Sequence, residues 1–128
     1  MNAIYARQSV DRADSISIES QIEFCQYEMR GEQYKVYTDR GYSGKNTDRP
    51  AFAEMMNQKA AELGCTNTHF TCPHGLYDHN NYSTARDMAK IALACHANGT
   101  YMQVANTVSY TLPATNIHPA RNISSTNR

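Results

Sequence analysis

The stretch 48-DRPAFAEMMNQKAAELG-64 decides the fold, because it changes from turn chemistry to helix chemistry within a few residues. Pro50 suits the first position of a helix, where its missing N–H costs nothing. Strong helix formers follow it, and Gly64 is placed to end the helix. The predicted apolar face comprises Phe52, Met55, Met56, Ala60 and Leu63. What this helix packs against depends on the segments on either side of it.

The residues before this helix contain two strand-like segments and one helix-like segment. Residues 2–6, NAIYA, are a short apolar run typical of an interior strand, and residues 34–38, YKVYT, alternate like a second strand. Between them, residues 15–31 predict a helix with Ser17 as its N-cap and Gly31 as its stop. Its apolar stripe at helical spacing comprises Ile18, Ile22, Cys25 and Met29. The order strand, helix, strand predicts a βαβ unit of the α/β class with a parallel pair of strands.

The residues after the decisive helix predict one further helix. Residues 83–99 begin with a cap at Ser83 or Thr84, carry Asp87 in the first turn, and reach a stop at Asn98-Gly99. The predicted apolar stripe comprises Met88, Ile91, Ala92 and Cys95. Two strand-like segments come later, at residues 108–112 and, cut short, at 121–128.

Residues 65–82 are too rich in Asn, Gly, Pro and His for regular structure, and they concentrate four candidate metal ligands. These are Cys65, His69, Cys72 and His74. Their spacing, C-x3-H-x2-C-x-H, lacks the paired C-x2-C or H-x3–5-H units that fix tetrahedral geometry. We therefore interpret them as loop and core residues and expect no metal.

The composition is neutral, since 12 Lys and Arg balance 12 Asp and Glu in 128 residues. No global basic field therefore draws the chain to nucleic acid or to an acidic membrane. The first residues lack the pattern of a secretory signal, and no apolar run approaches the ~20 residues that span a membrane. We expect a cytoplasmic protein with no membrane partner, whose four cysteines stay reduced.

Candidate chemistry lies in the loop after the first predicted strand. Ser9 lies just past the strand end, where side chains of open α/β sheets face a ligand. Arg7 precedes it by two residues, and that spacing points both side chains the same way near a strand end. A hydroxyl beside a guanidinium suits attack on a phosphodiester, with serine as nucleophile and arginine on the phosphate oxygens. The spacing alone also fits two solvated residues of a surface loop.

Three separated motifs extend this pattern over about residues 1–56. They are YARQS at 5–9, SISIESQ at 15–21 and DRGYSGKNTDRP at 39–50. In this order and at these intervals they resemble the N-terminal part of the serine site-specific recombinases, which include the resolvases and invertases. The resemblance implies that Ser9 attacks DNA and forms a phosphoserine link. It also implies that Arg7 and Arg49 hold the scissile phosphate as catalytic and DNA-binding residues, and that no metal or cofactor takes part.

This resemblance ends near Met56. The recombinase family next requires a strand and a helix with a further Asp-Arg…Arg cluster, then a long dimer helix and a DNA-binding region. Nothing after Met56 supplies them. Without that cluster, much of the charge stabilisation for phosphoryl transfer is missing. We therefore expect Ser9 to be a nucleophile in an incomplete, inactive site.

The second half resembles the D-alanyl-D-alanine carboxypeptidases of the penicillin-binding proteins. The matching segments are residues 52–92, with NTHF, PHGL and YSTARDMA in register, and less tightly 109–116 and 121–128. The resemblance implies an incomplete α+β domain and peptidoglycan peptides as the alternative partner. The family's chemistry uses S-x-x-K, S-x-N and K-T-G elements, none of which occurs here in family register. By register the triplet Ser125-Thr126-Asn127 belongs to a strand, and His74 and Ser83 are loop and cap residues.

Both families place a helix beginning near F-x-x-M-M, so the decisive stretch is a joint. We predict a chimera, with a partial recombinase domain at residues 1–51 and a partial carboxypeptidase domain at 52–128. Three hypotheses follow: a recombinase fragment acting on DNA, a carboxypeptidase fragment acting on peptidoglycan, and a non-catalytic protein. We favour the third for activity and the first for descent, because it alone keeps a candidate nucleophile. Each half lacks partners for its apolar faces, so we also expect oligomers or aggregates.

Overall fold

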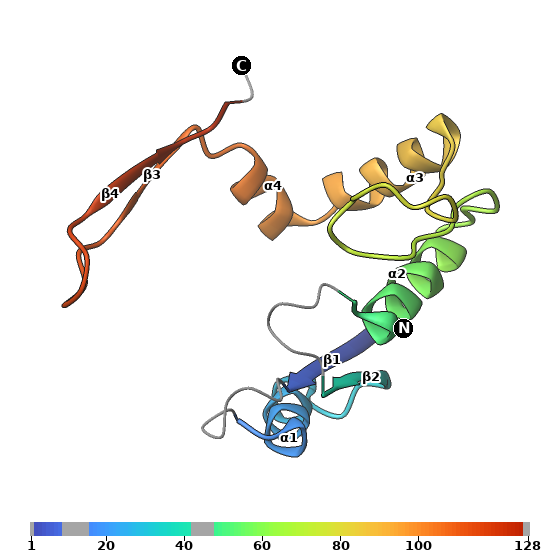
Figure 1. Cartoon of the computed structure of the whole chain (residues 1–128), viewed down its shortest axis with the longest axis horizontal. Coiled ribbons are helices and arrows are strands. Elements are labelled where there is room, and N and C mark those ends of the chain that lie inside the picture. Colours follow the sequence, from blue (N-terminus) through green and yellow to red (C-terminus); the bar gives the residue numbers. More distant parts are fainter. Residues whose placement is uncertain (1, 9–15, 42–47, 127–128) are drawn as a thin grey trace. The chain divides into compact units, whose positions relative to one another are not determined.

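The computed structural model describes residues 2–8, 16–41 and 48–126. It is of mixed α/β class, as predicted, and divides into two compact units, residues 1–90 and 91–128. Figure 1 shows the elements in chain order. They are β1 (Asn2–Gln8), α1 (Ile18–Met29), β2 (Tyr34–Arg40), α2 (Pro50–Glu62), α3 (Ala85–His96), α4 (Gly99–Ala105), β3 (Ser109–Leu112) and β4 (Arg121–Ser124).

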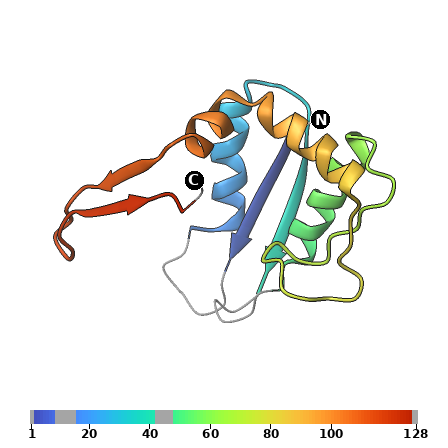
Figure 2. The same ribbon diagram turned by 90° about the horizontal axis from the view of Figure 1, so that it is seen from above.

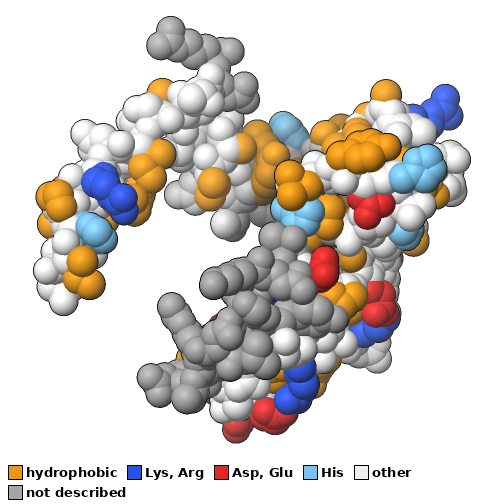
Figure 3. All heavy atoms as spheres, in the orientation of Figure 1, with side chains coloured by type: hydrophobic (Ala, Val, Ile, Leu, Met, Phe, Trp, Pro, Cys, Tyr) orange, Lys and Arg blue, Asp and Glu red, His pale blue; other side chains and the backbone are white. Residues whose placement is uncertain are grey.

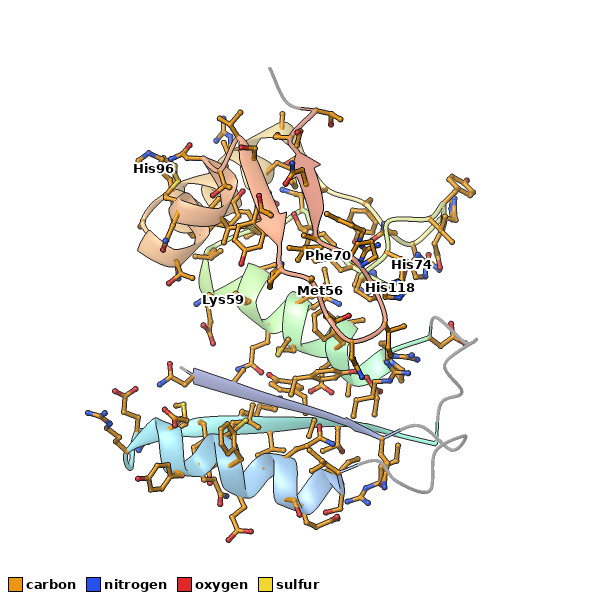
Figure 4. All side chains as sticks on the ribbon, turned by 90° about the vertical axis from the view of Figure 1, so that its left-hand side faces the viewer. Met56, Lys59, Phe70, His74, His96 and His118 are labelled. Carbon is orange, nitrogen blue, oxygen red and sulfur yellow. The ribbon has the colours of Figure 1, made fainter. Side chains whose placement is uncertain are left out.

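The first two strands confirm the predicted parallel pair. β1 and β2 are in register from Asn2 opposite Tyr34 to Gln8 opposite Arg40, so β2 runs two residues beyond the predicted strand. Side chains alternate between the two faces of this sheet. The sheet lies between α1 and α2, as Figures 2 and 4 show. This arrangement buries Ile4 and Ala6 of β1.

Helix α1 forms as its sequence predicts. The Ser17 side chain accepts a hydrogen bond from the Ser20 N–H at 3.1 Å and caps the helix. Ile18 of the predicted stripe is buried, and the other three members are half-buried. Past the helix end, Arg30 and Gly31 both have positive φ, at 49° and 86°. Glycine adopts this left-handed conformation freely, which explains the stop at Gly31.

Helix α2 begins at Pro50, as predicted, and its Glu54 and Gln58 contact β2. Lys35 donates hydrogen bonds to the carboxylate of Glu54 at 2.9 Å and to the amide oxygen of Gln58 at 3.0 Å. The hydroxyl of Tyr37 donates to the same Gln58 oxygen. Residues four apart lie on the same helix face, so these contacts attach one face of α2 to the strand.

A second face of α2 holds the loop that follows it. Asn57 donates to the Phe70 carbonyl and accepts from the Phe70 N–H, both at 2.7 Å. Phe70 accordingly lies beside α2 in Figure 4. The buried residues of α2, Ala53 and Ala60, lie four and three positions from Asn57 and so share its side of the helix. The predicted large apolar side chains, Phe52, Met55, Met56 and Leu63, are only half-buried.

A buried carboxylate connects the loop to α3. Asp87 is 1% exposed and accepts hydrogen bonds from the Asn67 N–H at 2.8 Å, the Thr68 hydroxyl at 2.9 Å and the Lys90 ammonium at 3.2 Å. Lys90 also donates to the Gly64 carbonyl, just past α2. The Thr84 hydroxyl accepts from the Asp87 N–H at 3.2 Å, so Thr84, rather than Ser83, is the cap of α3.

The predicted apolar stripe of α3 is wrong in part. Met88 is 48% exposed and Ala92 is exposed, whereas the buried residue of the helix is Asp87. The reason is that the hydrogen bonds of Asp87 turn its side of α3 toward the loop. Periodicity of apolar residues cannot detect a contact made by a carboxylate.

The predicted stop at Asn98-Gly99 also has a different role. α3 ends at His96, and Asn98 begins a further helix, α4, which the sequence analysis did not predict. The Asn98 side-chain oxygen accepts the Tyr101 N–H at 2.9 Å, which is an N-cap. Asparagine suits both ends of helices, so its presence alone does not distinguish a stop from a start.

Strands β3 and β4 confirm the two predicted C-terminal strands and form an antiparallel pair. Tyr110 lies opposite Ile123 on one face, and Thr111 donates to the Asn122 side-chain oxygen at 2.8 Å on the other. Both Tyr110 and Ile123 are exposed. Figure 3 shows hydrophobic side chains at the surface of this hairpin, at the left of the view. Between residues 91 and 126, no described residue is buried.

The loop residues considered as metal ligands do not form a metal site among the described positions, where no group of three or more His, Cys, Asp or Glu side chains is arranged to hold an ion. All four cysteines are free thiols. Among the helices of residues 2–8, 16–41 and 48–126, none has the length and apolarity that a membrane span requires.

We expect residues 91–126 to make the isolated chain associate, because exposed apolar side chains without a core favour aggregation. Val108 is 76% exposed and Tyr110 is 59% exposed. Light scattering and size-exclusion chromatography should therefore show oligomers or aggregates. A monomeric elution profile together with a cooperative thermal transition above ~60 °C would contradict this expectation.

We expect Asp87 to make the first unit sensitive to acid. Burial of the carboxyl tends to raise its pKa, but the hydrogen bonds from Asn67, Thr68 and Lys90 together hold that pKa below its ordinary value. The stabilisation is therefore present above the ordinary Asp pKa of about 3.9 and is lost as the pH falls through the lower folded value.

The substitution Asp87→Asn should lower stability at pH 7 and weaken the loss of stability below about pH 4. Urea unfolding followed by circular dichroism between pH 7 and pH 2.5 measures both effects. Glu28→Gln is the matched control, because Glu28 is an exposed carboxylate on α1. Equal acid sensitivity in Asp87→Asn and the native chain would show that Asp87 does not carry this stabilisation.

Candidate functional site

The C-terminal halves of β1 and β2 bring Arg7 of the predicted N-terminal site together with three further polar side chains. Arg7 lies opposite Asp39 in the parallel register, and Tyr5 lies opposite Tyr37. Paired residues of neighbouring strands direct their side chains to the same face, and residues two apart share it. All four side chains therefore lie on the face that α2 covers.

Asp39 fixes the start of α2. Its side chain is 1% exposed, with Oδ1 accepting the Ala51 N–H at 3.1 Å and Oδ2 accepting the Phe52 N–H at 3.3 Å. Arg49, the residue at the N-cap position, provides no side-chain cap. Asp39 thus satisfies the unpaired N–H groups of the first turn from a neighbouring strand, and its negative charge complements the positive end of the helix.

Tyr5 provides the third hydrogen bond that Asp39 accepts. Its hydroxyl donates to Asp39 Oδ2 at 2.9 Å, and its ring packs edge-on against Phe52 with centroids 4.8 Å apart. Burial, followed by the hydrogen bond to Asp39 and the negative charge there, raises the pKa of Tyr5 to about 12. The positive charges of Arg49 and Arg7 act on this pKa in the opposite direction. Tyr5 is therefore a neutral hydrogen-bond donor under the electrostatic influence of both arginines.

Gln21 of α1 holds the end of β1 in place. Its side-chain oxygen accepts the Arg7 N–H at 3.2 Å, and its side-chain nitrogen donates to the Arg7 carbonyl at 2.9 Å. The same nitrogen donates to the Ile16 carbonyl at 2.9 Å. One amide thus joins the strand end to the residues that lead into α1. The backbone from which the Arg7 side chain projects is fixed by these bonds.

Arg7 carries an unsatisfied donor. Its Nε–H is buried and has no hydrogen-bond partner among the described residues. Within the same residues, no carboxylate forms an ion pair with its guanidinium, although Asp39 lies directly opposite. A buried donor without a partner costs about 1–3 kcal/mol. An anion with two or more oxygens would satisfy the planar guanidinium, which matches carboxylate and phosphate groups.

The predicted residues of this site are placed in part. Arg7 lies near the end of β1, and Arg49 lies directly before α2, where it donates to the Asp48 carbonyl. Ser9 lies outside the described residues, so its position beside Arg7 stays a prediction. Three residues that the sequence motifs contain, but for which no role was predicted, belong to this arrangement. Tyr5 lies in the motif with Arg7, and Gln21 and Asp39 lie in the two motifs after it.

His74 and Ser83, which the sequence analysis interpreted as loop and cap residues, make separate local contacts. His74 Nδ1 accepts the Leu76 N–H at 3.1 Å. The Ser83 hydroxyl lies 2.9 Å from the Thr68 hydroxyl, which in turn donates to Asp87. Both residues are exposed. These contacts are structural: one closes a turn, and the other extends the hydrogen bonds around Asp87.

Comparison with known families gives two matches that overlap in this chain. Residues 2–69 match the N-terminal domain of the resolvases. Residues 42–128 match the D-alanyl-D-alanine carboxypeptidases. Each match covers more than half of the 128 residues, and their shared part, residues 42–69, contains the whole of α2.

Individual relatives come from the carboxypeptidase side. A D-alanyl-D-alanine carboxypeptidase of Haemophilus influenzae is 57% identical over 42 residues, which is 33% of this chain and 11% of the relative. That of Streptomyces sp. strain K15 is 41% identical over 61 residues, or 48% of this chain and 21% of the relative. This chain therefore spans only a small part of the length of these relatives.

A solved structure agrees with this side of the comparison. The D-alanyl-D-alanine carboxypeptidase of Mycobacterium tuberculosis H37Rv superposes with a TM-score of 0.53 and 34% identity, over 60% of this chain and 29% of that one. The two family matches and the two incomplete resemblances in the sequence lead to the same conclusion. The chain belongs to two families, the resolvase N-terminal domains through residues 2–69 and the D-alanyl-D-alanine carboxypeptidases through residues 42–128.

Proposed function

We propose that the end of β1 is a phosphate-binding site of recombinase descent, with which the chain binds the DNA backbone weakly and without cleaving it. Arg7 and Arg49 bind the phosphate, and by its place in the sequence motif Ser9 corresponds to the nucleophile that forms a phosphoserine link in recombinases. The observation that carries the proposal is the buried, unpartnered Nε–H of Arg7. The recombinase-derived part is residues 1–51, and DNA as ligand implies a cytoplasmic protein.

Binding without turnover follows from the donors that the sequence lacks. Cleavage requires charge stabilisation in the transition state, and the loss of one such donor costs ~10²–10³ in rate. The further Asp-Arg…Arg cluster of the recombinases has no counterpart after Met56. Two arginines hold a ground-state phosphate but leave most of the developing charge uncompensated.

The first test is DNA binding as a function of salt. Two phosphate contacts predict a slope of about −2 for the logarithm of the binding constant against the logarithm of the salt concentration on duplex DNA. Arg7→Gln should reduce this slope by about 1. Arg86→Gln is the matched control, because it removes the same charge from an exposed position on α3. An unchanged slope in Arg7→Gln would rule out the proposed phosphate contact.

The same preparation tests for strand cleavage. A supercoiled plasmid with a recombination site is incubated with the chain, treated with protease and examined for covalent protein–DNA adducts. We expect none. An adduct that Ser9→Ala abolishes would show a working recombinase and would contradict the absence of turnover.

The second candidate function is favoured by the carboxypeptidase relatives and the solved structure. On this reading, residues 52–128 are the middle of a carboxypeptidase domain, whose family acts on peptidoglycan stem peptides. The chain has no S-x-x-K sequence, in which a lysine one helical turn away activates the serine. We therefore propose that this part forms no acyl-enzyme and that the chain as a whole is non-catalytic.

Penicillin capture tests this second candidate. Incubation with a fluorescent penicillin, followed by denaturing electrophoresis, should leave the chain unlabelled, whereas a complete carboxypeptidase in the same gel should carry label. If label appears, Ser83 is the residue to test, because its interpretation as a structural residue would then be in doubt. A stoichiometric band that is absent in Ser83→Ala would show that Ser83 is a nucleophile rather than a structural residue.

A further inference from the structure

We propose that Tyr5 is a positioning residue that keeps Arg7 available for its anion, because it holds the Asp39 carboxylate away from the guanidinium. This inference rests on the phosphate site proposed above, and it assigns that site an internal competitor. Asp39 is the competitor, since it is an acceptor directly opposite Arg7 on the neighbouring strand. Tyr5 and the first turn of α2 are the groups that occupy it.

The register makes an ion pair between Arg7 and Asp39 the default outcome. Adjacent strands lie ~4.8 Å apart, and paired side chains share a face, so an arginine easily reaches a carboxylate opposite it. Opposite charges in this arrangement attract, and a guanidinium binds a carboxylate in a two-pronged geometry. The described residues nevertheless show no such pair, and the Arg7 Nε–H is left buried without a partner.

The hydrogen bonds of Asp39 explain why the pair does not form. Oδ1 accepts the Ala51 N–H, and Oδ2 accepts both the Phe52 N–H and the Tyr5 hydroxyl, all between 2.9 and 3.3 Å. Both oxygens are thereby turned toward α2. The backbone donors belong to the helix and cannot be removed by a side-chain change. Tyr5 is therefore the one side chain in this set whose loss frees an acceptor position on Asp39, at Oδ2, which keeps its bond from the Phe52 N–H.

The substitution Tyr5→Phe removes this donor with little change in packing. It keeps the aromatic ring, and with it the edge-on contact to Phe52 at 4.8 Å. Tyr37→Phe is the matched control, since it also removes a hydroxyl from the covered face of the sheet, but one that donates to Gln58. Both variants are measured by thermal unfolding, so that an effect on the fold is distinguished from an effect on Arg7.

The first measurement needs no ligand. The Nε–H of Arg7 is observed by NMR in the whole chain, with no phosphate present. We expect this signal to move in Tyr5→Phe, as Asp39 turns and pairs with Arg7, and to stay in place in Tyr37→Phe. In Tyr5→Phe/Asp39→Asn the signal should return toward its native position, because the amide carries no charge to pair with arginine. A signal that stays in place in Tyr5→Phe overturns the inference.

The second measurement titrates the same signal with inorganic phosphate. Tyr5→Phe should weaken phosphate binding about fivefold, because phosphate must then displace Asp39 from an ion pair with Arg7, and a partly exposed ion pair contributes about that factor in affinity. Tyr5→Phe/Asp39→Asn should recover most of the lost phosphate affinity. If Tyr5 had only a structural role, this double variant would bind phosphate no better than Tyr5→Phe. If the native chain binds no phosphate while the ligand-free signal moves as expected, the proposed function fails and the positioning role of Tyr5 stands.

Discussion

The hydrogen bonds between the Asp39 carboxylate and the first turn of α2 are the constraint on which the first unit depends. A parallel pair of strands with one helix has too little core to be stable alone, so β1, α1 and β2 need a second covering layer. Asp39 supplies the attachment, because its carboxylate accepts the N–H groups of a helix end that has no side-chain cap of its own, and its negative charge complements the helix dipole. From there α2 runs over the sheet and brings Glu54 and Gln58 to Lys35.

The same helix explains how segments from two families share one compact unit. At 100° per residue, Glu54 and Gln58 lie on one face and Asn57 on a neighbouring one. The first face bonds to β2, which lies in the recombinase match, and the second bonds to Phe70, which lies only in the carboxypeptidase match. A joint within α2 therefore leaves neither set of contacts without its helix. The two family matches overlap at residues 42–69, and the helix inside this overlap, α2, is the element that contacts both sides.

The sequence predicted the parts of the fold that local patterns control. Pro50 and Gly31 mark helix ends through their backbone conformation and Ser17 through its side-chain cap, and the structure confirms each of them. It did not predict the burial of Asp87 or the attachment of α2 by Asp39, because each depends on partners 12 or more residues away in the chain. The same limit applies to the candidate site. The sequence motif indicated Arg7 as a site residue. That its Nε–H has no partner among the described residues follows only from the structure, in which Asp39 bonds to Tyr5 and α2 instead.

The two buried carboxylates, Asp39 and Asp87, show which part of the chain forms a packed structure and which part does not. A buried carboxylate requires several donors, and Asp39 and Asp87 each have three or more, from neighbouring segments that fit together. Both lie in residues 1–90. The described residues beyond them bury no side chain, although the Tyr110–Ile123 pair forms a regular hairpin face. Correct strand pairing thus survives without a core, because it needs only the two strands, whereas burial needs a further layer. For this reason the binding site that we propose lies at the end of β1, where Gln21 holds the backbone of Arg7, and not in the hairpin.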